Sequence, residues 1–452
     1  MVRAGPARIA IFLRWLTAQP HYPGIRHWVQ AGSESKRLPQ GARLEVFQPR
    51  RSSCSRCFPR IAAAPGAMFP RLSGAIQLGR RWNGCHLDWP KVQSKEGGLM
   101  DQQPVSFSAA NQRSGSKSAE TWWNGEAAVR AAAVRCQGNP EAMLRALQSA
   151  QGAPPAPAAG DTRRLWELLA SVAATDLVAA RTLEPHLDAA GILSQAGIGW
   201  EDGTTWGVFA AQSPTAKLEA ARLPGGGWML NGTKPWCSLA AQLSHALVTA
   251  GTPHGDRLFM LSLRQTGVEP ATGCWVSRGM AQLPSGAVDF DAVPAQPVGE
   301  AGWYLTRPGF AVGGAGVAAC WFGGAVGIYR HLLRSAQART PDQLALAWLG
   351  EAERLLAGAA AILEHAAGLA DAGQLDAIAA HQVRGQVAGA CTRILQLSGQ
   401  ATGPGPLTAD EEHARRAADL GIYLRQHHAA RDDAALGQLV LDSAATAGRS
   451  PW

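Results

Sequence analysis

The sequence predicts a multidomain α+β protein with an N-terminal helical domain, a middle β-barrel or β-sandwich, and a C-terminal four-helix bundle. Three changes in hydrophobic pattern lead to this fold class. Apolar residues recur at helical spacing over 119–199, short strand-like segments between Gly and Pro turns fill 200–300, and helical spacing returns over 301–447. A chain of 452 residues is long enough to give each of these domains its own core.

Residues 1–118 are expected to form a disordered or non-native leader outside the three domains. Residues 1–99 contain 16 Lys and Arg against 4 Asp and Glu, whereas the rest of the chain contains 26 against 30. The net charge of +8 therefore belongs to the leader, and no basic stripe on the body indicates a nucleic-acid partner. Residues 101–118 are polar and Ser-rich, which is typical of a flexible segment.

Two hypotheses account for residues 1–99: an Arg-rich transit-like leader, or sequence that is not a natural part of the protein. We favour the second. The segment Lys95-Glu-Gly-Gly-Leu-Met100 can be encoded with a purine tract of the kind that precedes bacterial start codons. Translation is therefore expected to begin at Met100, and the intact mass of the natively expressed protein tests this.

Cysteine usage and hydropathy narrow the class of protein further. The eight cysteines are scattered, which does not indicate a disulfide framework, and the single pair Cys54 and Cys57 is too little for a zinc site. The most apolar run, 310–329, is rich in Gly and Ala, so we expect a core helix and not a membrane span. We expect a cytoplasmic protein without a metal or a membrane partner.

The N-terminal domain is predicted from helix-start signals and an apolar stripe. Asn139-Pro-Glu141 places an N-cap residue before a proline at the first helical position. Apolar residues between 165 and 172 have the i, i+3, i+4, i+7 spacing of a helix that begins at 161 or 162. The helical pattern continues to residue 193.

The middle domain is predicted from short apolar or alternating segments between Gly and Pro turns. The expected strands are 206–211, 217–223, 228–229, 245–250, 257–263 and 287–293. Closely spaced strands of this kind indicate a small barrel or sandwich.

The C-terminal domain is predicted as four antiparallel helices on short loops, which make a bundle. The expected helices are 312–337, 340–369, 375–397 and 408–436. Capping boxes at Thr340-Pro-Asp-Gln343 and Thr408-Ala-Asp-Glu411 mark the starts of the second and fourth.

One stretch, 228–238, suggests a binding site. Asn231-Gly232 is a strong two-residue turn signal, and Trp236 and Ser238 follow it two positions apart. On a strand, that spacing would aim both side chains at the same face. An aromatic wall beside a hydrogen-bond donor suits a planar, polar heterocycle. The alternative is an aromatic packed in the barrel with a serine at its rim.

The run Leu230-Asn-Gly-Thr-Lys-Pro-Trp-Cys-Ser238 resembles the hairpin of the acyl-CoA dehydrogenase superfamily, and the order of domains over about 160–440 is similar to that of the superfamily. The resemblance implies that Trp236 flanks the isoalloxazine ring of FAD and that Ser238 hydrogen-bonds near flavin N5. The segment Phe209-Ala-Ala-Gln-Ser-Pro214 stands where relatives carry a flavin-contacting loop. Ser213 is the one residue of this segment whose hydroxyl the resemblance implies as a flavin contact.

The resemblance also implies how the dinucleotide part of FAD is anchored across a dimer. Arg339 stands after the first bundle helix, and Gln396-Leu-Ser-Gly-Gln400 stands where the family has a Gln- and Gly-containing loop, so Gln396 and Gly399 are its expected contacts. The Arg fork pairs well with pyrophosphate oxygens. Without FAD, Arg339 would serve as a partner of the helix dipole. A homodimer or homotetramer is implied.

The resemblance implies removal of an α-proton by a glutamate while flavin N5 accepts the β-hydride. Arg425 and Val317 occupy the two positions where that glutamate is expected, and an arginine cannot act as a base. Asp419 or Glu364 would then be the nearest candidates for the base.

A flavin-dependent monooxygenase on the same fold needs no such base. The segment Tyr423-Leu-Arg-Gln-His-His-Ala-Ala-Arg431 resembles the end of such enzymes, which would make His427 or His428 the acid–base residue. Alternatively, both histidines are solvated polar residues on a helix.

Three functional hypotheses follow. The first is an FAD-dependent oxidoreductase that carries out α,β-oxidation of an acyl-CoA thioester and passes electrons to an unspecified acceptor. The others are a flavin-dependent monooxygenase and a catalytically inactive flavin-binding homologue.

Overall fold

The computed structural model describes residues 102–108, 123–273 and 275–448. All of them belong to the unit Lys91–Trp452. The expectations about residues 1–99, including translation from Met100 and the pair Cys54 and Cys57, lie outside the described residues.

The N-terminal helices are α5 (Glu126–Cys136), α6 (Glu141–Ser149), α7 (Thr162–Thr175) and α8 (Leu177–Gln195). Oδ1 of Asn139 accepts a hydrogen bond of 3.0 Å from the backbone N–H of Glu141, but the N-cap residue is Pro140, so α6 begins one residue later than the sequence predicts. The carboxylate of Asp176 accepts the backbone N–H of Ala179 at 2.9 Å and caps α8.

The segment 102–108 packs against the helical body, contrary to the expectation of a flexible stretch up to residue 118. Val105 and Phe107 are buried, and the backbone N–H of Val105 donates to Oγ of Ser171 at 2.9 Å. The ring of Phe107 meets that of Phe322 edge to face, with centroids 5.6 Å apart. Two apolar side chains are enough to anchor a segment whose overall composition is polar.

In the described residues one sheet contains the strands β1 (Trp206–Phe209), β2 (Leu218–Arg222), β3 (Trp228–Lys234), β4 (His245–Thr252), β5 (Gly255–Ser262), β6 (Val268–Pro270) and β7 (Val288–Val298). Strands β4, β2, β3, β7 and β5 pair in that order, and β5 pairs back onto β4. These five strands therefore close a ring, which leaves few free edges. β1 extends the sheet by pairing with β4 in parallel.

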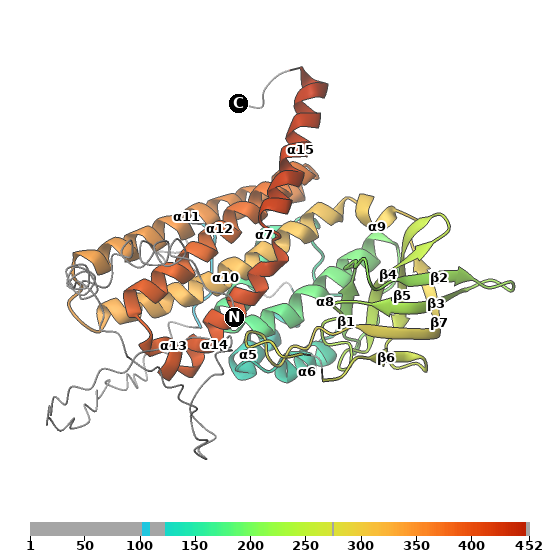
Figure 1. Ribbon diagram of the computed structural model, residues 1–452, viewed down its shortest axis with the longest axis horizontal. Helices are drawn as coiled ribbons and strands as arrows, with labels where there is room; N and C mark the ends of the chain where they lie inside the picture. Colours follow the sequence, from blue (N-terminus) through green and yellow to red (C-terminus); the bar gives the residue numbers. More distant parts are fainter. Residues whose placement is uncertain (1–101, 109–122, 274, 449–452) are drawn as a thin grey trace, which may run out of the picture. The chain divides into compact units, whose positions relative to one another are not determined.

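The rest of the described chain is helical. The helices are α9 (Trp303–Thr306), α10 (Gly309–Gln337), α11 (Gln343–Asp371), α12 (Ala377–Thr402), α13 (Gly405–Ala409), α14 (Glu411–Tyr423), the 3-10 helix η1 (Leu424–Gln426) and α15 (Ala430–Ala447). The protein is therefore a mixture of helix and sheet with a helical C-terminal region. Figure 1 shows α10, α11 and α12 lying side by side, with α8 between them and the sheet.

The single helix expected over 408–436 is wrong, because the chain breaks into α13, α14, η1 and α15. The hydroxyl of Thr408 bonds back to the carbonyl of Pro404 at 2.9 Å instead of starting a helix. Asp410 caps α14, and Ala429, with φ of +47°, separates η1 from α15. Likewise the N-cap of α11 is Asp342 and not Thr340.

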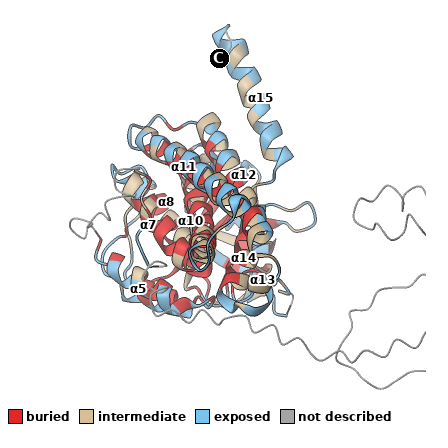
Figure 2. Ribbon diagram, turned by 90° about the vertical axis from the view of Figure 1, so that its left-hand side faces the viewer, coloured by how far each residue is buried: buried red, intermediate tan, exposed pale blue. Residues whose placement is uncertain are grey.

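Helix α10 is the core helix of the C-terminal region. Among the described residues it is the one helix long and apolar enough to cross a membrane, yet 72% of its most apolar window is buried inside the protein. Figure 2 shows it in red between α7, α11 and α12. Its glycines allow close approach, since a Cβ at Gly323 would collide with the backbone carbonyl of Ala170 on α7.

Helix α15 differs from the other long helices because none of its residues is buried. It projects away from the bundle in Figures 1 and 2. It still contacts α12, so the turn before it, which contains His427 and His428, lies between packed elements.

Candidate active site

Charged and hydroxyl side chains gather where α8 meets the loop after β3 and the end of α14. We call Arg181, Glu184, Ser238, Arg384 and Tyr423 the polar seam. They come from α8, the loop after β3, α12 and α14, so four separate elements meet there.

The loop after β3 does not have the geometry expected from the sequence. The strand ends at Lys234, and Trp236 has φ of +61°, so Trp236 and Ser238 are not on a strand and do not share a face. Cys237, between them, is buried in the core. Nζ of Lys234 is also buried and donates to the carbonyl of Thr249 at 2.7 Å.

As a result the two residues have different surroundings. The indole of Trp236 is 63% exposed, which is unusual for so large an aromatic side chain. Oγ of Ser238 lies 2.8 Å from Oγ of Ser285 and receives a long hydrogen bond, 3.4 Å, from Nη2 of Arg181. Beside Ser238 is a cavity of about 10 Å³, lined also by Arg181 and Phe209, which has room for about one water molecule.

Helix α8 forms one wall of that cavity with Arg181, Thr182 and Pro185. Pro185 has no N–H, so the carbonyl of Arg181 lacks its usual helical donor at the cavity. Nη1 of Arg181 holds Oε2 of Glu184 at 3.0 Å. Burial raises the pKa of Glu184 to about 7, although the positive charge of Arg181 opposes this.

Tyr423 closes the seam from the bundle side. It is buried, and in the described part of the chain its hydroxyl has no hydrogen-bond partner of ordinary geometry. Burial, the thiol of Cys320 and the carboxyl of Glu184 raise its pKa well above the ordinary value, so the phenol stays neutral. An unpaired buried hydroxyl carries a desolvation cost, which a bound polar ligand would remove.

Arg384 and His427 continue the seam toward the turn before α15. Arg384 donates to the carbonyls of Gly314 at 2.7 Å and Gln426 at 2.9 Å, and its guanidinium lies 4.9 Å from the ring centroid of Trp321. The ring of His427 also meets that of Trp321 edge to face, with centroids 6.4 Å apart.

Asp432 faces both histidines. Its Oδ2 is 4.0 Å from Nε2 of His427, and its Oδ1 is 3.3 Å from Nδ1 of His428. Burial is the main cause that lowers the pKa of His427. His428 is the more exposed of the two, so His427 is the better candidate for chemistry inside the seam.

The carboxylates proposed from the sequence as bases have other partners. Asp419 is buried, and its Oδ1 accepts the backbone N–H of Met280, so it ties α14 to the β-domain loop. Glu364 is half-exposed and pairs with Arg163 at 3.1 Å. Arg425 is exposed. None of the three faces the polar seam.

Asp419→Ala is expected to destabilise the protein by about 1–3 kcal/mol, because the buried N–H of Met280 loses its acceptor. Chemical denaturation measures this. An exposed carboxylate, Glu219, gives the control Glu219→Ala, which should change the free energy of unfolding by less than about 0.5 kcal/mol. Equal effects of the two substitutions would contradict a structural role for Asp419.

The residues expected to anchor a dinucleotide lie elsewhere. Arg339 follows the end of α10, a helix that rises roughly 40 Å from its start near the seam. Gln396 and Gly399 lie within α12 and not on a loop, which corrects the expectation, and they follow Arg384 by more than three turns. Ser213 is exposed, with its Oγ 3.0 Å from Oγ1 of Thr215. These four residues do not join the seam within one chain.

A flavin ring fits part of this arrangement. The exposed side chain of Trp236 and the hydroxyl of Ser238 are groups that a planar heterocycle with polar edges can use. The cavity beside Ser238 is too small for a tricyclic ring, so the ring would lie on the outer side of the loop toward Trp236.

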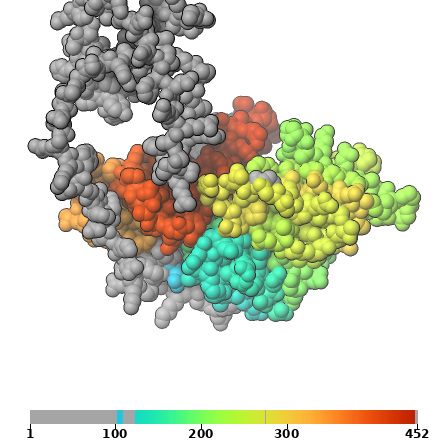
Figure 3. Space-filling view, turned by 60° about the horizontal axis from the view of Figure 1, so that its bottom comes forward, coloured from blue at the N-terminus to red at the C-terminus, as the bar shows by residue number. Residues whose placement is uncertain are grey.

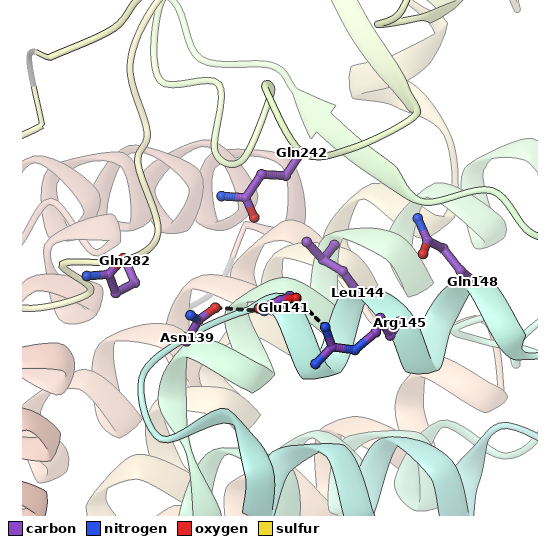
Figure 4. Close-up of a pocket in the computed structure, with 7 residues that line it drawn as sticks. All are labelled: Asn139, Glu141, Leu144, Arg145, Gln148, Gln242 and Gln282. Atoms are coloured by element: carbon purple, nitrogen blue, oxygen red, sulfur yellow. Dashed lines mark hydrogen bonds and ion pairs between the residues drawn. The ribbon is translucent and has the colours of Figure 1, made fainter.

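A larger hollow, about 560 Å³, lies between α6 and two β-domain loops. Figure 3 shows the N-terminal helices, in teal, next to the yellow β-domain on this face. Figure 4 shows its lining, which includes Gln242, Gln282 and Gln148 and the ion pair of Glu141 with Arg145. The two charged residues of this lining, Glu141 and Arg145, pair with each other, so we do not place the chemistry here.

The fold places helices, a closed β-sheet and a second helical region around one polar junction. No protein-family model and no curated protein matches the sequence. Solved structures do match. TdsC from Paenibacillus sp. A11-2, in complex with FMN and indole, has a TM-score of 0.56 at 19% identity, covering 71% of this chain and 96% of that one.

Two further structures have similar scores. KijD3, in complex with FMN and a dTDP-linked amino-keto sugar, has a TM-score of 0.56 at 20% identity, covering 72% of this chain and 86% of that one. A glutaryl-CoA dehydrogenase from Mycobacterium smegmatis, in complex with FADH2, has a TM-score of 0.54 at 16% identity and covers 67% and 90%. The protein therefore has the fold of the flavin-dependent acyl-CoA dehydrogenase-like proteins.

Sequence reasoning missed Arg181, Glu184 and Arg384. A signal was available, because Arg181 and Glu184 stand three residues apart in a helix rich in Leu and Ala, and Pro185 follows at once. Charged residues on the apolar side of a helix are costly to bury unless they are paired. Such a pair therefore indicates a polar site.

Proposed function

We propose that the protein is a flavin-dependent oxidoreductase that oxygenates a small organic substrate. The flavin, when bound and reduced, supplies the electrons with which molecular oxygen is activated. We choose oxygenation over α,β-oxidation because of the residues at the two positions where a dehydrogenase base is expected. They hold Arg425 and Val317, whereas His427 lies against Trp321 at the seam and faces Asp432.

The residues of this chain would have separate roles in the reaction. Ser238 offers a hydroxyl to the edge of the ring, and Trp321 excludes water from the turn around His427. Nδ1 of His427 accepts the backbone N–H of Ala429 at 3.3 Å, which leaves Nε2 to carry the proton of the neutral ring. Asp432 orients that ring, so His427 can exchange a proton at Nε2.

The relatives provide the first test compounds. TdsC is a dibenzothiophene monooxygenase and has been crystallised with indole. We would load the purified protein with FMN or FAD, reduce it anaerobically, and then admit oxygen in the presence of indole or dibenzothiophene. An oxygenated product that His427→Ala reduces by a factor of about 10²–10⁴ supports the proposal. Bleaching of the oxidised flavin by acyl-CoAs under anaerobic conditions contradicts it.

The second candidate is α,β-oxidation of an acyl-CoA thioester with FAD. It is favoured by the likeness to the glutaryl-CoA dehydrogenase. It requires a carboxylate base at the seam, and Glu184 is the carboxylate there. FAD would need Arg339, Gln396 and Gly399 of a second copy, because these residues lie far from Ser238 in one chain. A homodimer or homotetramer and a cytoplasmic location are proposed with it.

Trp236→Ala is expected to weaken flavin retention, because the indole supplies an exposed stacking face. It should leave the free energy of unfolding within about 0.5 kcal/mol, because the side chain is mostly exposed. Equilibrium dialysis with FMN and FAD measures retention. Leu344→Ala, a similarly exposed residue at the start of α11, is the control. Unchanged flavin binding in Trp236→Ala would remove Trp236 from the ring site.

A further inference from the structure

We propose that Arg384 is the residue that holds His427 in place. Its guanidinium bridges helix α10 to the turn 424–429, which carries His427, and both side chains meet the indole of Trp321. Arg384 is a positioning residue, because it acts through His427. The inference rests on the proposed function, in which His427 exchanges a proton.

The turn 424–429 has one hydrogen bond to a distant part of the described chain. Nη2 of Arg384, on α12, donates to the carbonyl of Gln426 at 2.9 Å, across 42 positions in the sequence. The hydrogen bonds of the two histidines in the turn reach no further along the chain than Asp432, so they do not attach the turn to the body. Leu424 is buried at the start of the turn, but apolar burial is not directional. The guanidinium therefore supplies the directional contact of the turn with the body.

The guanidinium of Arg384 has a second fixed end on α10. Its Nη1 donates to the carbonyl of Gly314 at 2.7 Å, and its central carbon lies 4.9 Å from the ring centroid of Trp321 on the same helix. Because the guanidinium is a rigid planar fork, two bonds from one end of it fix the separation of the two carbonyls. The distance between the turn and α10 is thereby set.

His427 lies between the two helices that this bridge joins. Its ring meets that of Trp321 edge to face, with centroids 6.4 Å apart, and its side chain is only 11% exposed. On the other side is α12, where a Cβ built at Gly385 would lie 3.8 Å from Nε2 of His427. Gly385 follows Arg384 directly, so the residue that holds the turn is next to the one that borders the imidazole.

The charged neighbours of His427 come from three elements. Asp432 and Asp433 face it from α15, His428 from the turn, and Arg384 from α12. Burial is the main cause that lowers the pKa of His427, and it outweighs the two carboxylates, which act in the opposite direction. This supports the geometry, because a ring held against Trp321 is kept from water. Release of the turn would therefore raise this pKa.

Two substitutions separate the bridge from the charge. Arg384→Lys keeps the cation but has a single point donor, which cannot span two carbonyls. Arg384→Met removes both the charge and the donors and keeps an unbranched side chain. The measurement is nuclear magnetic resonance of the full chain with isotope-labelled histidine, titrated between pH 4 and 9. The signal of His427 is identified as the one that His427→Gln removes.

In both variants the His427 signal should lose the ring-current shift that Trp321 causes, and its pKa should rise toward the ordinary 6.5. Arg393→Met is the control on the same helix. Arg393 is 38% exposed and pairs with Glu351 on α11, so its loss should leave the His427 signal and titration unchanged.

Each outcome of the titration decides the role of Arg384. A wild-type signal in Arg384→Lys would mean that a point charge is sufficient, and it would overturn the bridge. A wild-type signal in Arg384→Met would overturn any positioning role. If Arg384→Met does not fold, Arg384→Lys decides alone. If circular dichroism shows that both variants are unfolded, Arg384 supports the whole fold and its specific role for His427 is overturned.

The oxygenation assay with FMN links this role to the proposed function. Arg384→Lys should lower product formation by up to about 10²-fold, because a displaced acid–base group loses most of its effect. In the presence of His427→Ala the same substitution should cause no further loss, since the two residues act as a unit. Equal losses with and without His427 would overturn the inference. If the wild type forms no oxygenated product, the proposed function fails, whereas the titration of His427 still decides whether Arg384 holds it.

Discussion

Glu184→Gln should make the protein more stable than the wild type at pH 9 and equally stable at pH 4.5 or below. The pKa of Glu184 is about 7 in the folded protein against a model value of 4.5, so the folded state binds the proton more tightly. The wild type therefore has its full stability below pH 4.5 and loses about 3 kcal/mol as the pH rises through 7. Gln cannot ionise, so the variant avoids this loss.

Urea denaturation at a series of pH values between 4.5 and 9 measures the effect. In Glu184→Gln, Arg181 loses the carboxylate with which it pairs. The gain in free energy of unfolding will therefore be smaller than the full value. Glu219→Gln, on the exposed face of β2, should have the same dependence of the free energy of unfolding on pH as the wild type. If Glu184→Gln also shows the same pH dependence of stability as the wild type, the carboxyl of Glu184 is not desolvated and its assignment to the seam is wrong.

Gly323→Ala should destabilise the protein by about 1–3 kcal/mol or more. A Cβ at this position would collide with the carbonyl oxygen, carbonyl carbon and Cα of Ala170, all of them backbone atoms of α7 that cannot rotate away. Relief would require α7 and α10 to separate. Because α8 follows α7 directly and carries Arg181 and Glu184, that movement should also disturb the seam.

Gly314→Ala is the matched control on the same helix, because no atom lies within 4 Å of a Cβ built there. In a helix interior, Ala is favoured over Gly by up to about 1 kcal/mol, so this change should be neutral or stabilising. Thermal and denaturant unfolding of both variants test the pair. Equal stabilities would mean that α7 and α10 do not pack as closely as the structure shows.

The fold could be predicted because its signals are local. Strand-length segments between turns and long periodic helices are visible in the sequence, and Asn139-Pro-Glu141 marks the start of α6 to within one residue. The division of 408–436 into separate helices could not be predicted, since it depends on Thr408 bonding backward and on the left-handed backbone at Ala429. Similarly, Val105 and Phe107 are anchored by residues more than sixty positions away.

The site was predicted only in part because its geometry is not local. The motif pointed to the loop after β3, but Trp236, with φ of +61°, and Ser238 lie in that loop and not on a strand, so the alternation of a strand does not apply to them. The partners of Ser238 come from α8 and from Ser285, which no spacing along the chain reveals. Asp419 is a candidate base by its position in the sequence, yet its carboxyl oxygen accepts a backbone N–H instead.

The most direct test of the central proposal is the crystal structure of the protein loaded with FMN. We expect the isoalloxazine ring to lie against Trp236, with a polar edge within about 3 Å of Oγ of Ser238 and Arg181 beside it. A ring bound instead in the hollow around Gln242 and Gln282, or crystals that take up no flavin, would contradict the placement of redox chemistry at the polar seam.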